Sequence, residues 1–377
     1  MTGFRTTKGS ILKNRLTFIA TALLLTSAAL PAVSAQTADT QRVAPQTDNS
    51  QIVSRFEQQL ASFNSRSATQ QRPAEGFSLP VTLDDRQTRA NIVKRTNVTI
   101  EGSRIETFSG QIDGQPALFI KSADTLHILS PDEAGMKRYT FSRGKTQYQR
   151  SILERAPRGI TSTASDEIIS QDAPPPLAKD SQARGGKKKL RVFAFLHDDV
   201  GMPQETVYVN HLAWWAADLD NKLPEELNGI EIRYIANMPG YTNFDYYVSD
   251  TNTMLDKWKE KVQQYKRDNK VTQLPDYSYY TNKFILLTRN AYPNGVMGIA
   301  FVGGDSAWSS LLHSSTAAHE LGHTLSASHE SAEILYRNGW WCETNVYPEG
   351  FALRSACQIY SDANIGRIKD YLIEASR

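Results

Sequence analysis

Three histidines toward the C-terminal end constrain the fold of this chain more than any other feature. His319 and His323 are four residues apart, and His329 lies six residues beyond the second. On an α-helix, a spacing of four places two side chains on one face, one turn apart, so that both imidazoles can reach one cation. A sharp turn after Leu325 would return His329 as a third ligand. Three neutral imidazoles that leave one coordination position open are typical of a catalytic zinc site, so we expect one Zn²⁺ here.

Glu320 directly follows the first of these histidines. Its side chain points to a neighbouring face of the expected helix, from which it can reach a water bound to the metal. Two other interpretations stay open: a surface helix with ordinary histidines, and a zinc site that is degenerate or purely structural. The chain has 7 His in 377 residues. Chance therefore produces His-Glu-x-x-His about 0.006 times per chain, and a third His at the right distance about once in ten thousand, which argues against ordinary histidines.

The pattern His319-Glu320-x-x-His323-x-x-x-x-x-His329 resembles the zinc signature of the metzincin metalloendopeptidases. That signature has Gly where this chain has Ser326, because the backbone needs a positive φ to leave the helix. The resemblance implies a secreted zinc endopeptidase that hydrolyses peptide bonds of proteins with a zinc-bound water. Glu320 would be its general base, and the three histidines would be its metal ligands.

A second stretch extends the resemblance. Residues 342–346 (Cys-Glu-Thr-Asn-Val) resemble the C-x-T-x-M turn of secreted metzincins, with Val346 in place of the Met. Residues 360–365 resemble the segment that follows this turn in the reprolysin-like branch. Two rival functions remain. In a gluzincin-type hydrolase, Glu349 would replace the third histidine. Alternatively, Ser326 and Val346 would mark an exported binding or adhesion protein on an inactive metzincin scaffold.

The first 35 residues have the composition of a secretory signal peptide. A basic start is followed by a mostly apolar run at 16–30 and by small residues at 32–35, which predicts cleavage after Ala35. An uncleaved anchor is the alternative, but the apolar run is short. No other run is long enough to span a bilayer. We therefore expect a secreted or periplasmic protein without stable membrane insertion after signal removal.

Composition divides the rest of the chain into two lobes. Polar residues at 36–76 predict a mobile leader with one amphipathic piece at 52–63. Residues 77–155, here called the N-terminal lobe, consist of short alternating runs between turn residues, which predicts a small antiparallel β-rich unit. Residues 156–189 form a linker that ends in a basic run at 183–189 (Ala-Arg-Gly-Gly-Lys-Lys-Lys). Such a run is accessible to proteases. We interpret it as an activation site behind a prodomain, or else as a plain linker.

Residues 190–377, here called the C-terminal lobe, alternate strand and helix patterns. Apolar strands are expected at 190–197, 230–235, 283–288 and 295–303, and helices at 205–223, 252–267, 309–326 and 365–375. This order predicts an α/β or α+β fold with a mostly parallel sheet covered by helices. It resembles the N-terminal half of the metzincin catalytic domain, in which the strand before the zinc helix is an antiparallel edge strand that lines the cleft. Gly298-Ile299-Ala300-Phe301 takes that place here and would pair with an extended substrate, unless it is an ordinary core strand.

The two cysteines, Cys342 and Cys357, both lie near the C-terminal end. In an exported chain an even pair most simply forms a disulfide, worth about 3 kcal/mol for a loop of this size. The alternative is a thiolate ligand to the metal, but three histidines are already available for that role. A net charge of +2 gives no sign of the strongly basic surface that nucleic-acid-binding proteins carry. We expect a monomer whose partner is a protein or peptide substrate.

Overall fold

The computed structural model describes residues 48–69, 76–154, 167–169, 188–248, 250–293, 295–348 and 354–374. The predicted signal peptide, the basic residues at 183–187 and Glu349 lie outside these ranges. Among the described residues, no helix has both the length and the apolar character that a membrane crossing requires.

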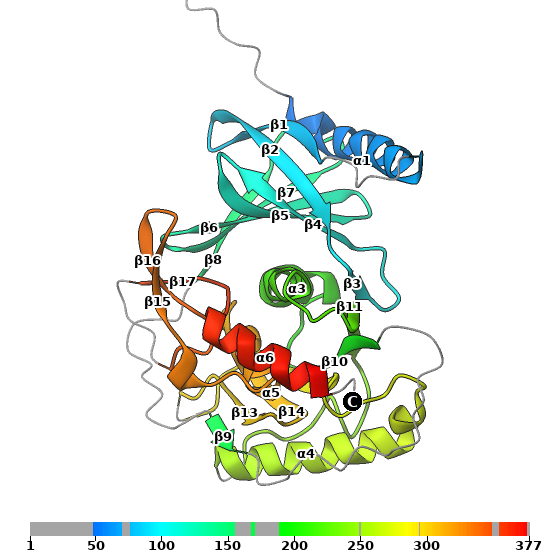
Figure 1. Cartoon of the computed structure of the whole chain (residues 1–377), viewed down its shortest axis with the longest axis vertical. Helices are drawn as coiled ribbons and strands as arrows, with labels where there is room; N and C mark the ends of the chain where they lie inside the picture. Colours follow the sequence, from blue (N-terminus) through cyan, green and yellow to red (C-terminus); the bar gives the residue numbers. More distant parts are fainter. Residues whose placement is uncertain are drawn as a thin grey trace, which may run out of the picture. The chain divides into compact units, whose positions relative to one another are not determined.

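Seven strands of the N-terminal lobe form one antiparallel sheet, as the sequence predicts. Their order is β1-β2-β4-β5-β6-β7-β8, and every neighbouring pair is antiparallel. The helix α1 (Ile52–Thr69), preceded by the short helix η1 (Asn49–Gln51), packs on this sheet (Figure 1). Ile52, Phe56 and Leu60 are buried in the same core as the strands, so this part of the expected leader is packed. The strands are β1 (Phe77–Leu83), β2 (Arg86–Arg95), β4 (Glu106–Ile112), β5 (Gln115–Ser122), β6 (Thr125–Asp132), β7 (Gly135–Ser142) and β8 (Gln149–Glu154).

The second sheet is mixed and has the order β3-β11-β10-β12-β14-β13-β9. Its pairs are parallel except for β13, which runs antiparallel to β14. Both outer strands come from the chain before residue 188, since β3 belongs to the N-terminal lobe and β9 to the predicted linker. The strands are β3 (Val98–Ile100), β9 (Glu167–Ile169), β10 (Lys188–Leu196), β11 (Leu227–Ile235), β12 (Asn282–Thr288), β13 (Gly298–Val302) and β14 (Ser306–Ser310).

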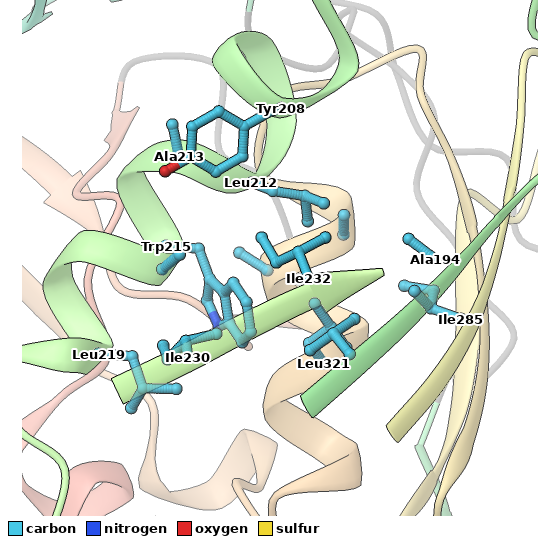
Figure 2. Packing of buried hydrophobic residues seen from close by; sticks show 14 of the residues in the cluster. Ala194, Tyr208, Leu212, Ala213, Trp215, Leu219, Ile230, Ile232, Ile285 and Leu321 are labelled. Carbon is cyan, nitrogen blue, oxygen red and sulfur yellow. The ribbon is translucent and has the colours of Figure 1, made fainter. Parts of the chain in front are cut away.

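Side-chain alternation along the central strands separates two hydrophobic cores. In β10, Val192 and Ala194 face one core, whereas Phe193 and Phe195 face the other. This division follows from the strand period of two, which sends successive side chains to opposite faces. The first core is covered by α2 (Gln204–Val207), the π-helix η2 (Tyr208–Leu212), α3 (Ala213–Asp220) and α5 (Thr316–Thr324), and Figure 2 shows Trp215 of α3 and Leu321 of α5 among its side chains. The second core is covered by α4 (Thr251–Asp268), which the short helix η3 (Val271–Gln273) follows.

The expected helix at 309–326 is shorter than predicted. It begins at Thr316, and the residues before it include the strand β14, which lies between β13 and the helix in the chain. Ser306, Ser309 and Ser310 are buried in that strand. Buried strands are normally recognised by apolar and β-branched side chains. Because three of the five residues here are serines, the sequence pattern did not predict this strand.

The chain after the third histidine forms a small sheet and a closing helix. The sheet has the order β15-β16-β17, and the predicted bond between Cys342 and Cys357 is present beside it. The elements are η4 (His329–Ser331), β15 (Ile334–Arg337), β16 (Trp340–Glu343), β17 (Ser355–Ala356) and α6 (Asp362–Glu374).

Candidate metal centre

The three predicted ligands converge. The helix α5 carries His319 and His323 one turn apart, and η4 supplies His329. The Nε2 atom of His329 lies 3.2 Å from Nε2 of His319 and 3.1 Å from Nε2 of His323. One nitrogen from each ring can thus be chosen so that all three lie within 4.8 Å of one another.

These separations fit a shared metal ion. Tetrahedral coordination with zinc–nitrogen bonds of about 2.0–2.1 Å places ligand nitrogens about 3.3 Å apart. The three imidazoles therefore form a group that could bind a metal ion, and a set of three nitrogens is one that zinc accepts. No Cys or carboxylate of the described residues belongs to this group.

A specific helix end turns the chain so that His329 can return. The amide of Ala327 donates to the carbonyl of Gly322 at 2.9 Å, and the amide of Ser326 donates to that of His323 at 2.8 Å. This pair of bonds is the Schellman arrangement, which requires a left-handed residue at the position of Ser326. Ser326 has a φ of 72°. The chain therefore makes with Ser a turn that Gly makes with less strain.

Two sets of hydrogen bonds support the histidines, one within the turn itself and one from α6 to the residue before His329. Nδ1 of His323 lies 3.0 Å from the carbonyl oxygen of Ala327. If Nδ1–H donates there, the lone pair of Nε2 is left for a metal, which is how ligating histidines are usually oriented. Asn364 of α6 is fully buried and binds both backbone groups of Ser328, at 2.9 Å and 3.1 Å. This amide fixes the residue directly before His329, a role that the sequence analysis missed.

The C-terminal end of α5 is joined to the sheet by a partly buried hydrogen-bond network. The amide of Gly303, in the β13–β14 turn, donates to the carbonyl of His323 at 2.8 Å. The hydroxyl of Tyr371 donates to the Gly303 carbonyl at 2.7 Å, and Nζ of Lys283 donates to the Gly304 carbonyl at 2.7 Å. Burial lowers the pKa of Lys283 well below its usual value. Sequence reasoning placed Lys283 only in a strand, because its partners come from distant segments.

Two residues form a floor against α5 at Gly322. A Cβ built on Gly322 would lie 2.6 Å from Cε1 of Tyr360 and 2.9 Å from Cγ1 of Val346. Both side chains are buried, and Val346 has a φ of 62°, which is rare for a β-branched residue. Val346 therefore lies under the helix that carries His319 and His323, and the absence of a side chain at Gly322 allows the close approach.

Glu320 is 1% exposed and faces β13. A Cβ built on Gly298 would lie 2.3 Å from Oε1 of Glu320 and 2.6 Å from both Cγ and Cδ. The carboxylate therefore lies against the first residue of the strand that the sequence analysis assigned to substrate. It is on the same helix as two of the three converging histidines and directly follows one of them.

The predicted substrate strand has partners on both sides. Gly298, Ile299 and Ala300 pair with β14, while Ala300 and Phe301 pair on the other side with β9. Side chains alternate along it, since Ile299 and Phe301 belong to one core and Ala300 to the other. The strand is thus antiparallel to β14, but in this structure β9 covers its outer edge.

No protein-family model and no curated protein matches the sequence. Among solved structures, metalloproteinase-II from Bacteroides fragilis is similar to this chain, with a TM-score of 0.54 and 15% sequence identity. The similarity covers 83% of this chain and 95% of that protein. At this identity the comparison concerns the fold alone. The chain thus has a mixed α and β fold like that of a metalloproteinase, with three histidines that could hold a metal ion.

Proposed function

We propose that the protein is an exported zinc-dependent endopeptidase of the metzincin type. The observation that carries this proposal is the convergence of the Nε2 atoms of His319, His323 and His329, with the buried Glu320 next to the first of them in the same helix. The metalloproteinase-like fold supports it independently. His319, His323 and His329 would hold a zinc ion, which supplies Lewis acidity and lowers the pKa of a bound water.

Glu320 performs the proton transfers in this proposal. Its carboxylate accepts a proton from the attacking water and later delivers a proton to the leaving amine of the cleaved peptide. Almost complete burial supports this role, because electrostatic interactions are stronger where bulk water is excluded. The neighbouring helix and strand restrict the side chain to a small space, so the carboxylate is oriented before substrate arrives.

The strand segment Gly298–Phe301 holds the substrate in an extended form. Backbone amides and carbonyls on the outer edge of a strand can pair with any extended peptide, which suits an enzyme that acts on protein chains. In the described structure this edge is paired with Glu167–Ile169, from the part of the chain before residue 188. The N-terminal part therefore acts as a prosegment that keeps substrate off the edge until it is removed. Without a Cys in the N-terminal lobe, latency depends on this cover and not on a thiolate bound to the metal.

Hydrolysis of casein tests the proposed function. The chain from residue 36 onward is compared before and after limited trypsin cleavage, with trypsin then inhibited. We expect chelator-sensitive hydrolysis, at least about tenfold faster after cleavage, and a loss of about 10²–10⁴-fold in Glu320→Gln with zinc retained. A zinc-loaded, folded protein that cleaves nothing in either form overturns the proposal, and so does a fully active Glu320→Gln variant.

The mass of the mature protein tests export and maturation separately. A species that begins near residues 185–190 supports removal of the N-terminal lobe. A species that begins near Gln36 shows that the lobe is retained after signal cleavage. Detection of the full-length chain with its first 35 residues contradicts the predicted signal peptide.

A further inference from the structure

Gly298 lacks a side chain where the carboxylate of Glu320 needs the space. A Cβ at this position would lie 2.3 Å from Oε1, 2.6 Å from Cδ and 2.6 Å from Cγ of Glu320. Its φ is outside the left-handed region, in which other glycines of the chain are found. The backbone at Gly298 can therefore accept any residue, and the reason for Gly is the space that Glu320 occupies.

The strand cannot easily move away from Glu320. Gly298 pairs with Ser309 in the antiparallel ladder, and the amide of Ser310 donates to the carbonyl of the preceding residue, Met297, at 2.7 Å. The helix is equally restricted, since Ala317, Ala318 and Leu321 around Glu320 are buried. A methyl group at position 298 would therefore displace the more flexible partner, which is the end of the Glu320 side chain.

The required displacement is large on the scale of catalysis. Contacts to a real Cβ essentially never fall below 3.0 Å, so the gap to Oε1 must widen from 2.3 Å by at least 0.7 Å and the gaps to Cδ and Cγ from 2.6 Å by at least 0.4 Å. A misplacement of about 1 Å in an active site can reduce the rate by about 10²-fold.

We propose that Gly298 is a positioning residue that sets where the Glu320 carboxylate lies, so that the rate of proton transfer depends on the absence of a side chain at position 298. This inference rests on the proposed function, in which Glu320 is the general base. It gives Gly298 a role distinct from backbone pairing with substrate, because pairing would be unaffected by a methyl group on the strand.

The test is a double-mutant cycle on the trypsin-cleaved, zinc-loaded protein with casein-derived peptide as substrate. We expect Gly298→Ala to lower kcat by about 10²-fold and to change KM by less than about threefold, with zinc content unchanged. Glu320→Asp shortens the side chain by one methylene, so its carboxylate no longer reaches the position of Oε1 and the closest of the three overlaps, at 2.3 Å, is removed. Its cost in kcat should be at least fivefold smaller in the Gly298→Ala background than in the wild type.

Gly366→Ala serves as the matched control, because a Cβ at this helical glycine meets nothing within 4 Å. It should leave kcat and KM unchanged. The positioning role is wrong if Gly298→Ala retains kcat within threefold of the wild type. It is also wrong if the double variant Gly298→Ala, Glu320→Asp loses kcat by the product of the two factors measured for the single variants. If Glu320→Gln retains full activity, the proposed function itself fails, which distinguishes the two failures.

A stability cycle gives an answer even if Gly298→Ala folds poorly. The urea midpoint is measured for Gly298→Ala alone and in the Glu320→Ala background, where the overlapping atoms are absent. We expect the midpoint shift caused by the methyl group to shrink at least twofold in that background. An equal shift in both backgrounds shows that the methyl group clashes with something other than Glu320 and overturns the inference.

Discussion

The hydroxyl of Tyr360 donates a hydrogen bond of 2.5 Å to the carbonyl of Ala318, one residue before the first histidine of the candidate metal centre. The same hydroxyl accepts a bond of 2.9 Å from the indole N–H of Trp215. Tyr360 is fully buried, and burial raises its pKa. This contact joins the chain after the third histidine to the helix that carries the first two, with α3 as the third partner.

Replacing Tyr360 with Phe should therefore destabilise the protein. The indole N–H of Trp215 would remain buried without its acceptor, which costs about 1–3 kcal/mol. The free energy of unfolding, measured in urea, should fall by this amount. Tyr336→Phe is the matched control, since its hydroxyl also donates to a carbonyl, that of Gly339, but the side chain is 62% exposed. Equal losses in the two variants would contradict this explanation.

The strand and helix patterns predicted most of the fold because apolar periodicity survives wherever one face is buried. They failed at Ser306–Ser310, where buried serines hide a strand. They also gave no sign that Val98–Ile100 would leave its neighbours in the N-terminal lobe and pair with β11. Partner choice between strands depends on contacts far apart in the sequence, which local periodicity does not contain.

The convergence of the three histidines at the candidate metal centre was predictable because they lie within eleven consecutive residues and the helix period fixes the geometry of the first two. The residues that support it could not be found in the same way. Asn364 and Lys283 reach the site from α6 and β12, and nothing in the sequence near either one points to a histidine. Such supporting contacts emerge only once the tertiary arrangement is known.

Ser326→Gly should stabilise the protein. Ser326 has a φ of 72°, and a left-handed conformation costs a residue with a Cβ about 1–2 kcal/mol. Glycine removes this cost and adds a smaller one, the larger entropy of the unfolded chain. We expect a gain of about 0.5–1 kcal/mol in thermal or urea unfolding. Ser315→Gly, at a φ of −97°, should instead lower stability. A loss in both variants would contradict strain at Ser326.

Gly322→Ala and Gly366→Ala should have opposite effects. Both glycines are helical, and alanine favours a helix by about 1 kcal/mol. At Gly322 a Cβ would lie 2.6 Å from the buried ring of Tyr360, whereas at Gly366 it meets nothing within 4 Å. Overpacking of this kind costs about 1–3 kcal/mol, so Gly322→Ala should lower both stability and zinc affinity. Stabilisation by both variants would contradict this prediction, because it would show that Tyr360 and Val346 move readily to make room for a methyl group at position 322.

His211 should make stability depend on pH. Burial lowers its pKa from 6.5 to about 4. The unfolded chain then binds a proton that the folded protein does not, so the stabilising contribution is complete above pH 6.5 and is lost as pH falls toward 4. In the zinc-loaded protein, His211→Gln should reduce the slope of unfolding free energy against pH by about 1.4 kcal/mol per unit in this window. An unchanged slope would show that His211 is charged in the fold or exposed.

The zinc content of the purified chain tests the central claim most directly. We predict about one zinc per folded chain after dialysis, measured by mass spectrometry of the metal, and a content well below one in His329→Ala. His197→Ala, which changes a histidine outside the converging group, should keep its zinc. A folded wild-type protein without stoichiometric metal, or a His329→Ala variant that retains it undiminished, would contradict the account.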